Sequence, residues 1–325
     1  MNLLRYPALL YCIAFMGCPQ SRQPDSAMLK RSKVVTDTLG SPQVAYPPGS
    51  EALLLTRFTS LSQFRELVDV KYLGDLIDTN LSRSGKPQVQ LTYRRGNRQV
   101  TSILKSGVSQ ANFIRAQKGN FWNKMALGFK SPFAVRHRKD LRRIETLGRR
   151  KPEIYGIGDA AFYDLAEIMV LHISTDDLPG LSDKDLGEKG YLNTFNHITA
   201  QAFMTSVFSE EVADFVADVH ELYNMPELIT GDFTHQQIED FENGPVDNYV
   251  DMINNEWGQE LGKMLAEKYK ISRETDWTPV LLRNYLNDIQ SYHSWTFQIG
   301  FEPFRSTDEK VIRFAGKINH VLDLK

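Results

Sequence analysis

The chain has 325 residues, of which 42% are hydrophobic and 24% are charged, and its formal net charge is −2. A chain of this length can bury enough apolar surface to hold a folded domain together. Only two cysteines are present, Cys12 and Cys18, which excludes a scaffold stabilised by several disulfides.

The first 17 residues have the features of a secretory signal peptide. Arg5 provides a short basic start, and Tyr6 to Met16 is an apolar run of eleven residues without charge. A helix needs about 20 residues to cross the hydrocarbon core of a bilayer, whereas a short apolar run after a positive start is typical of an export signal. The alternative is an ordinary buried N-terminal helix, which would not normally stop at Gly-Cys-Pro.

The run ends in Phe15-Met16-Gly17-Cys18, which resembles the lipobox of bacterial prolipoproteins. The resemblance implies that residues 1–17 are removed and that Cys18 carries the lipid, palmitate included, that anchors the mature protein. Pro19 follows the cysteine where an inner-membrane retention signal would have Asp, so we expect the outer membrane, facing the periplasm. Residues 18–50 are rich in Ser, Pro, Gln, Gly and Thr and are predicted to form a flexible tether.

The strongest β signal lies in a basic segment, residues 51–151. Val89, Leu91 and Tyr93 alternate with polar residues, Arg95-Gly96-Asn97-Arg98 supplies a turn, and Val100 to Leu104 returns as a second strand. Ahead of this predicted hairpin, Ser60 to Leu76 carries apolar residues at helical spacing, and we expect one helix there.

Charge is distributed very unevenly along the chain. Residues 83–151 contain 18 Lys and Arg against 2 Asp and Glu, a net charge of +16, whereas residues 152–325 contain 12 against 31, a net charge of −19. Aromatic residues are interleaved with the basic ones after the hairpin. They are Phe113, Phe121, Trp122, Phe129 and Phe133. Such a stretch binds anionic lipid or an envelope polymer, or else packs against the acidic half of its own chain; export makes nucleic acid the least expected partner.

From residue 157 onward the pattern is helical. Asp159 is predicted to cap a helix that runs to His172, and Ser209 to cap another with Glu210 and Glu211 in its first turn. Further helices are expected over Thr194 to Phe208, Asp247 to Lys268 and Val280 to Ile289. The sequence therefore predicts a mainly α fold, with an acidic helical domain over 152–325 preceded by a small basic α+β segment that contains one β-hairpin.

One group of polar residues stands out in the helical region. His197 lies in one predicted helix, His220 and Glu221 close the next, and Asp251, Asn254 and Asn255 precede Gly258 and Gly262 on a third. Offsets of three, four, seven and eleven fall on one side of a helix, so the third helix carries a stripe that begins with a carboxylate and ends with two glycines. Because glycine costs about 1 kcal/mol against alanine inside a helix, we expect Gly258 and Gly262 to allow another helix to approach closely.

This pattern resembles an uncharacterised helical domain of bacterial secreted and toxin-associated proteins. The matching residues are His197, His220 with Glu221, and the Asp-x-x-Asn-Asn-x-x-Gly run from Asp251 to Gly258. The resemblance covers roughly residues 157–268. It implies a helical fold and a site, and it brings no established reaction.

Two hypotheses follow for the candidate residues His197, His220, Glu221, Asp251, Asn254 and Asn255. In the first they are catalytic, with His197, His220 and Asp251 binding a divalent metal or acting as acid and base. In the second they form a satisfied buried network that fixes the register of the helices. The sequence favours a cell-envelope lipoprotein that binds a partner protein or envelope component. The alternative is a metal-assisted hydrolase that acts on lipid or peptidoglycan.

Overall fold

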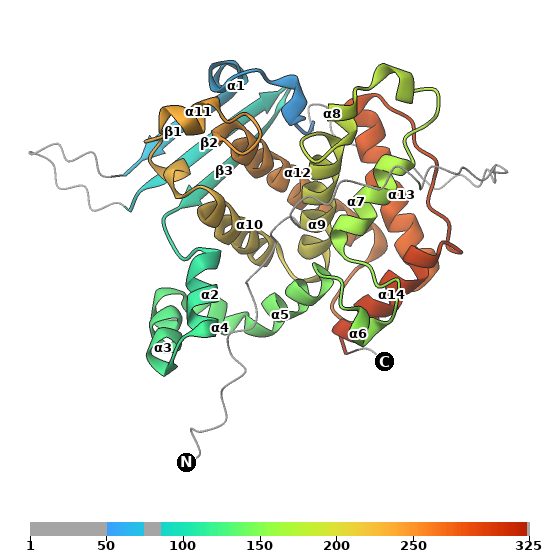
Figure 1. The fold of residues 1–325 in the computed structure, drawn as a ribbon. Coiled ribbons are helices and arrows are strands. Elements are labelled where there is room, and N and C mark those ends of the chain that lie inside the picture. The colour runs from blue at the N-terminus through green and yellow to red at the C-terminus, as the bar shows by residue number, and fades with distance from the viewer. Residues whose placement is uncertain (1–50, 75–85, 324–325) are drawn as a thin grey trace, which may run out of the picture.

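A computed structural model of the chain describes residues 51–74 and 86–323 (Figure 1). The predicted signal peptide, Cys18 and the tether lie outside the described residues. The first half contains η1 (Leu55–Arg57), α1 (Leu61–Leu67), β1 (Val68–Leu73), β2 (Gln88–Arg95), β3 (Arg98–Lys105), α2 (Gln110–Lys118), α3 (Phe121–Lys130), α4 (Pro132–Arg136), α5 (Arg138–Leu147) and α6 (Pro152–Tyr155). The second half contains α7 (Phe162–Leu171), η2 (Leu178–Gly180), α8 (Asp183–Leu186), α9 (Tyr191–Val207), α10 (Glu210–Asn224), η3 (Pro226–Ile229), α11 (His235–Glu239), α12 (Pro245–Tyr269), α13 (Pro279–Phe297) and α14 (Glu309–Val321). The predicted mainly α fold with a small β element before the helical region is confirmed.

The three strands form one antiparallel sheet in the order β1-β2-β3. The predicted hairpin is confirmed: Arg95 pairs with Arg98 across Gly96 and Asn97, and Gly96 has the positive φ, 55°, that such a two-residue turn requires. Alternate residues of β2 and β3 are buried, and the Tyr93 ring meets the Trp257 ring of α12 edge to face. One face of the sheet therefore packs on α12.

The helix predicted over Ser60 to Leu76 is wrong in its second half. Helix α1 ends at Leu67, and Val68–Leu73 is instead the edge strand β1, paired with β2 from Val68↔Tyr93 to Leu73↔Gln88. β-Branched or aromatic residues alternate with charged ones along Val68-Asp69-Val70-Lys71-Tyr72, which favours a strand. Hydrogen bonding of this strand to the hairpin stabilises it more than the weak helical spacing stabilises a longer helix.

Helices α9 and α12 are the central pair, and the two glycines hold them close. A Cβ on Gly258 would lie 2.7 Å from Cβ of Gln201 and 2.8 Å from the carbonyl oxygen of Ile198, and one on Gly262 would lie 2.5 Å from the carbonyl oxygen of Ala202. The predicted close approach of a second helix is thus confirmed, and α9 is that helix.

The core is continuous from Ala52 to Leu322. Its largest fully buried side chains include Trp257, Trp277 and Tyr285. Helix α14 completes it with Val311, Phe314 and Ile318, at helical spacing that the sequence prediction left out. No helix among the described residues has the length and apolarity needed to span a bilayer.

Asp159 has another role than the predicted helix cap. Ala161 stands at the N-cap of α7, while Asp159 accepts a 2.8 Å hydrogen bond from Nζ of Lys317, a lysine that is only 2% exposed. The same ammonium donates to the carbonyl oxygens of Arg149 and Ala160. A buried lysine must be paired and hydrogen-bonded to remain charged. Asp159 therefore pairs with Lys317 instead of capping α7. Ser209, by contrast, caps α10 as predicted.

Part of the basic segment does pair with the acidic half of the chain. Arg150 contacts Asp164 at 2.6 Å, Arg143 contacts Asp323 at 3.0 Å, and Arg98 lies 3.6 Å from Glu260. These contacts belong to β3, α5 and the segment before α6.

Candidate functional site

A ladder of polar pairs joins the start of α9 to the start of α12. Lys189 donates to Asp247 at 2.8 Å, Asn193 to Asp251 at 2.9 Å, and Gln259 to Gln201 at 3.3 Å. His197 and Asn255 form the remaining rung, with Nδ1 of the histidine 2.9 Å from Oδ1 of the asparagine. Each rung joins residues 58 apart in sequence, one helical turn after the previous rung, so the two helices run in the same direction with a fixed register.

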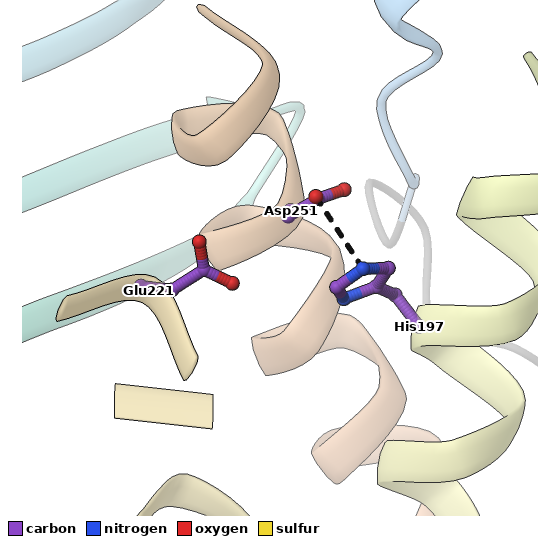
Figure 2. Close-up of side chains that lie close together, drawn as sticks. All are labelled: His197, Glu221 and Asp251. Carbon is purple, nitrogen blue, oxygen red and sulfur yellow. Dashed lines mark ion pairs between the residues drawn. The ribbon is translucent and has the colours of Figure 1, made fainter. Parts of the chain in front are cut away.

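The rung at His197 determines which ring nitrogen faces the interior. Oδ1 of Asn255 can only accept, so Nδ1 of His197 carries a proton and donates it. Nε2 then faces the Asp251 carboxylate, 3.3 Å from its Oδ2 (Figure 2). A histidine whose Nδ1–H is held by a carbonyl oxygen while Nε2 points at a carboxylate has the orientation of a metal ligand.

Glu221 lies against this pair from α10. Figure 2 shows His197, Glu221 and Asp251 projecting from three different helices toward one another. Ligand atoms of the three residues all lie within 4.8 Å of one another. Glu221 is 1% exposed, and neither of its carboxyl oxygens has a hydrogen-bond partner in the described part of the chain. An unpartnered buried carboxyl is costly, and a cation among these three side chains would satisfy it.

The site concentrates acidic groups in a region of low solvent exposure. Burial raises the pKa of Glu221 well above its usual range, and the nearby Asp251 and Asp247 raise it further. Burial likewise raises the pKa of Asp251. It raises that of Asp247 to about 7, although the Lys189 ammonium opposes the shift. Three carboxyl groups that hinder one another's ionisation form an environment that a divalent cation stabilises.

A cavity of about 1080 Å³ opens onto the pair of helices. His197, Asp251 and Asp247 line it, with His220 and Asn193 beside them. The cavity is also lined by Leu55, Thr56, Phe58 and Thr59 near the start of the described chain, and by residues 241–243 before α12. Of the candidate residues, His197, His220 and Asp251 are therefore open to a small molecule. Glu221, Asn254 and Asn255 are buried behind them.

The structure brings four of the six sequence-predicted residues together. His197, Glu221 and Asp251 form the cluster, and Asn255 orients the histidine. His220 lines the same cavity, its ring centroid 6.4 Å from that of His197, but its Nε2 accepts from Nδ2 of Asn224 at 3.1 Å. Burial, together with the nearby His197, lowers the pKa of His220 to about 3, so it is neutral.

Asn254 has a structural role. It is 0% exposed; its Oδ1 accepts from the backbone N–H of Leu53 at 2.8 Å, and its Nδ2 donates to the carbonyl oxygen of Leu53 at 2.9 Å. These two bonds fix the segment that continues into Leu55 and Thr56 on the cavity wall. Asn254 thus shapes the cavity without facing it.

Asp247, Asn193 and Lys189 also belong to the site, although the sequence pattern did not single them out. Asp247 lies one turn before Asp251, so extending the polar stripe toward the start of α12 would have found it. Asn193 lies one turn before His197 and carries the same signal. Lys189 precedes α9 in a loop, where no periodicity places a side chain.

Comparison of the chain with family models, with curated proteins and with solved structures gives no match.

Proposed function

We propose that the protein is a metal-assisted hydrolase of the bacterial cell envelope, anchored by lipid on Cys18. The observation that carries the proposal is Glu221, a buried carboxyl whose two oxygens have no partner in the described part of the chain. It lies beside His197 and Asp251, and these two residues line an open cavity. Buried polar groups are usually hydrogen-bonded, so two unpartnered carboxyl oxygens next to two further potential ligands favour a bound cation over a structural network.

His197, Glu221 and Asp251 would hold the ion. One nitrogen and two carboxylate ligands suit zinc or manganese, and three protein ligands leave a position for water. A bound ion of this kind lowers the pKa of its water toward neutrality. Asn255 keeps Nε2 of His197 turned inward, and Asn193 orients Asp251.

Asp247 is the residue we assign as general base. It lines the cavity, Lys189 holds its Oδ2, and its Oδ1 has no partner in the described part of the chain. A carboxyl whose pKa lies near 7 accepts a proton efficiently at neutral pH. The predicted substrates remain envelope lipid and peptidoglycan.

Hydrolysis by reloaded protein tests the proposal. Full-length protein is stripped with a chelator, reloaded with Zn²⁺ or Mn²⁺, and incubated with phospholipid vesicles or purified peptidoglycan while released fatty acid or soluble fragments are measured. We expect metal-dependent release that His197→Gln abolishes. His235→Gln is the matched control, because that histidine is 85% exposed on α11 and should leave the rate unchanged. Equal release by His197→Gln would overturn the assignment.

The anchor has its own test. Cys18→Ser should abolish the incorporation of radioactive fatty acid into the protein. Label retained by the variant would contradict lipidation at this residue and would leave the metal site untouched.

Binding of an envelope component is the second function we propose, and a specific surface supports it. Helix α3 exposes a row of aromatic side chains outside the core.

A further inference from the structure

Helix α3 presents an apolar face to solvent. Phe121, Trp122 and Phe129 are 66%, 68% and 78% exposed, and Met125 on the same face is 37% exposed. Phe121, Met125 and Phe129 follow one another at intervals of four residues, so they form one stripe, and the Trp122 ring packs edge to face on Phe121. Contiguous exposed apolar surface of this kind marks a contact site.

The fold leaves this stripe without a partner in the described part of the chain. Helix α3 directs Leu127, 5% exposed, toward the rest of the protein, and its neighbours are α2 and α4. Figure 1 shows α2, α3 and α4 at one edge of the molecule, below the sheet and away from α9 and α12. The stripe is therefore an outward-facing surface at the edge of the fold, separate from the cavity.

The charge around the stripe has one sign. Residues 110–139 contain seven Lys and Arg and no Asp or Glu. Arg115, Lys118, Lys130 and Arg136 are exposed. In contrast to Arg98, Arg143 and Arg150, none of these four forms an ion pair in the described part of the chain. These four basic residues are thus available to an external anionic surface.

We propose that α3 inserts its aromatic stripe into the interfacial region of a bilayer that contains anionic lipid. Aromatic residues, tryptophan above all, favour the level of the headgroups, and each basic residue near an anionic membrane contributes to binding. A charged protein groove would complement the lysines and arginines but would not accommodate four apolar side chains on a convex helix. This inference is independent of the metal site.

The fluorescence of Trp122 tests the proposal in the full-length chain. Of the four tryptophans in the chain, Trp257 and Trp277 are 1% exposed, and Trp295 on α13 is half-buried and lies outside the stripe. Vesicles of phosphatidylcholine with brominated acyl chains, prepared with and without phosphatidylglycerol, quench only tryptophans that reach the chains. We expect quenching in the vesicles with phosphatidylglycerol and much less without it. Trp122→Phe should abolish the quenching yet keep vesicle binding, because the apolar face is preserved.

A second pair of variants measures the affinity. Phe129→Glu should weaken binding to the anionic vesicles about tenfold, the loss expected when one large apolar side chain no longer enters the membrane. Leu171→Glu changes a residue of α7 that is 71% exposed outside the stripe, and its binding should match that of the unchanged chain.

Two results would overturn the proposal. The first is vesicle association without quenching of Trp122, which would assign all binding to the N-terminal region or to a partner protein. The second is quenching that persists in Trp122→Phe.

Discussion

Replacing Glu221 should stabilise the protein when no metal is bound. The carboxyl is 1% exposed and both its oxygens lack partners in the described part of the chain. A buried polar group left unsatisfied costs about 1–3 kcal/mol, and methionine fills a similar volume without polar demand. In a chelator, Glu221→Met should therefore raise the free energy of unfolding by about 1–3 kcal/mol.

Urea denaturation followed by circular dichroism measures this difference. Glu267→Met is the control: it changes an exposed carboxylate on α12 and should shift the unfolding free energy by less than about 0.5 kcal/mol. Adding metal should reverse the order, because an ion that binds only the folded state stabilises the unchanged chain. A Glu221→Met variant that is less stable than the unchanged chain in chelator would refute the reasoning, since the carboxyl would then be satisfied.

Three further variants test how the site is built. Gly258→Ala should lower the unfolding free energy in urea by about 1–3 kcal/mol despite its better helix propensity, because the new Cβ meets Gln201 at 2.7 Å; a gain would show that α9 yields. Asn254→Ala should cost about 2–3 kcal/mol in the same assay, because the backbone N–H of Leu53 loses its acceptor and its carbonyl oxygen keeps only the bond from Thr194. It should also speed proteolysis near residue 53, and unchanged cleavage would contradict the role of Asn254 in holding this segment. Burial lowers the pKa of His293 to about 3 from 6.5. As the pH falls from 6.5 toward 3 the unfolded chain takes up a proton that the folded chain refuses, so stability is lost by at most about 1.4 kcal/mol per pH unit. His293→Leu should remove that loss in acid titrations followed by circular dichroism, and an identical acid transition would count against it.

Much of the central helix pair could be predicted from the sequence. The spacing of Asp251, Asn255, Gly258 and Gly262 on one side of a helix predicted both a polar site and a close helix contact, and the structure has both along α9. The N-cap at Ser209 and the hairpin at Gly96 also follow from local chemistry. In these cases the interaction that determines the structure involves residues close together in sequence or residues on one face of a single helix.

Features set by distant partners could not be predicted. Asp159 pairs with Lys317, 158 residues away, and Asn254 binds Leu53 across 201 residues. The pattern over Ser60 to Leu76 is compatible with a helix, and the strand at Val68–Leu73 forms because it pairs with β2. Within the site, the His-Glu pair was recognised, but only the packing of α10 decides that Glu221 rather than His220 joins His197 and Asp251.

The measurement that tests the central claim most directly is metal retention after dialysis. The unchanged chain, His197→Ala and Glu221→Gln are loaded with Zn²⁺ or Mn²⁺, dialysed together against metal-free buffer, and analysed for bound metal by mass spectrometry. We predict one ion per chain in the unchanged protein and a large loss in both variants, because each removes a ligand. An unchanged chain that retains no ion, or variants that retain as much as it does, would contradict the metal site.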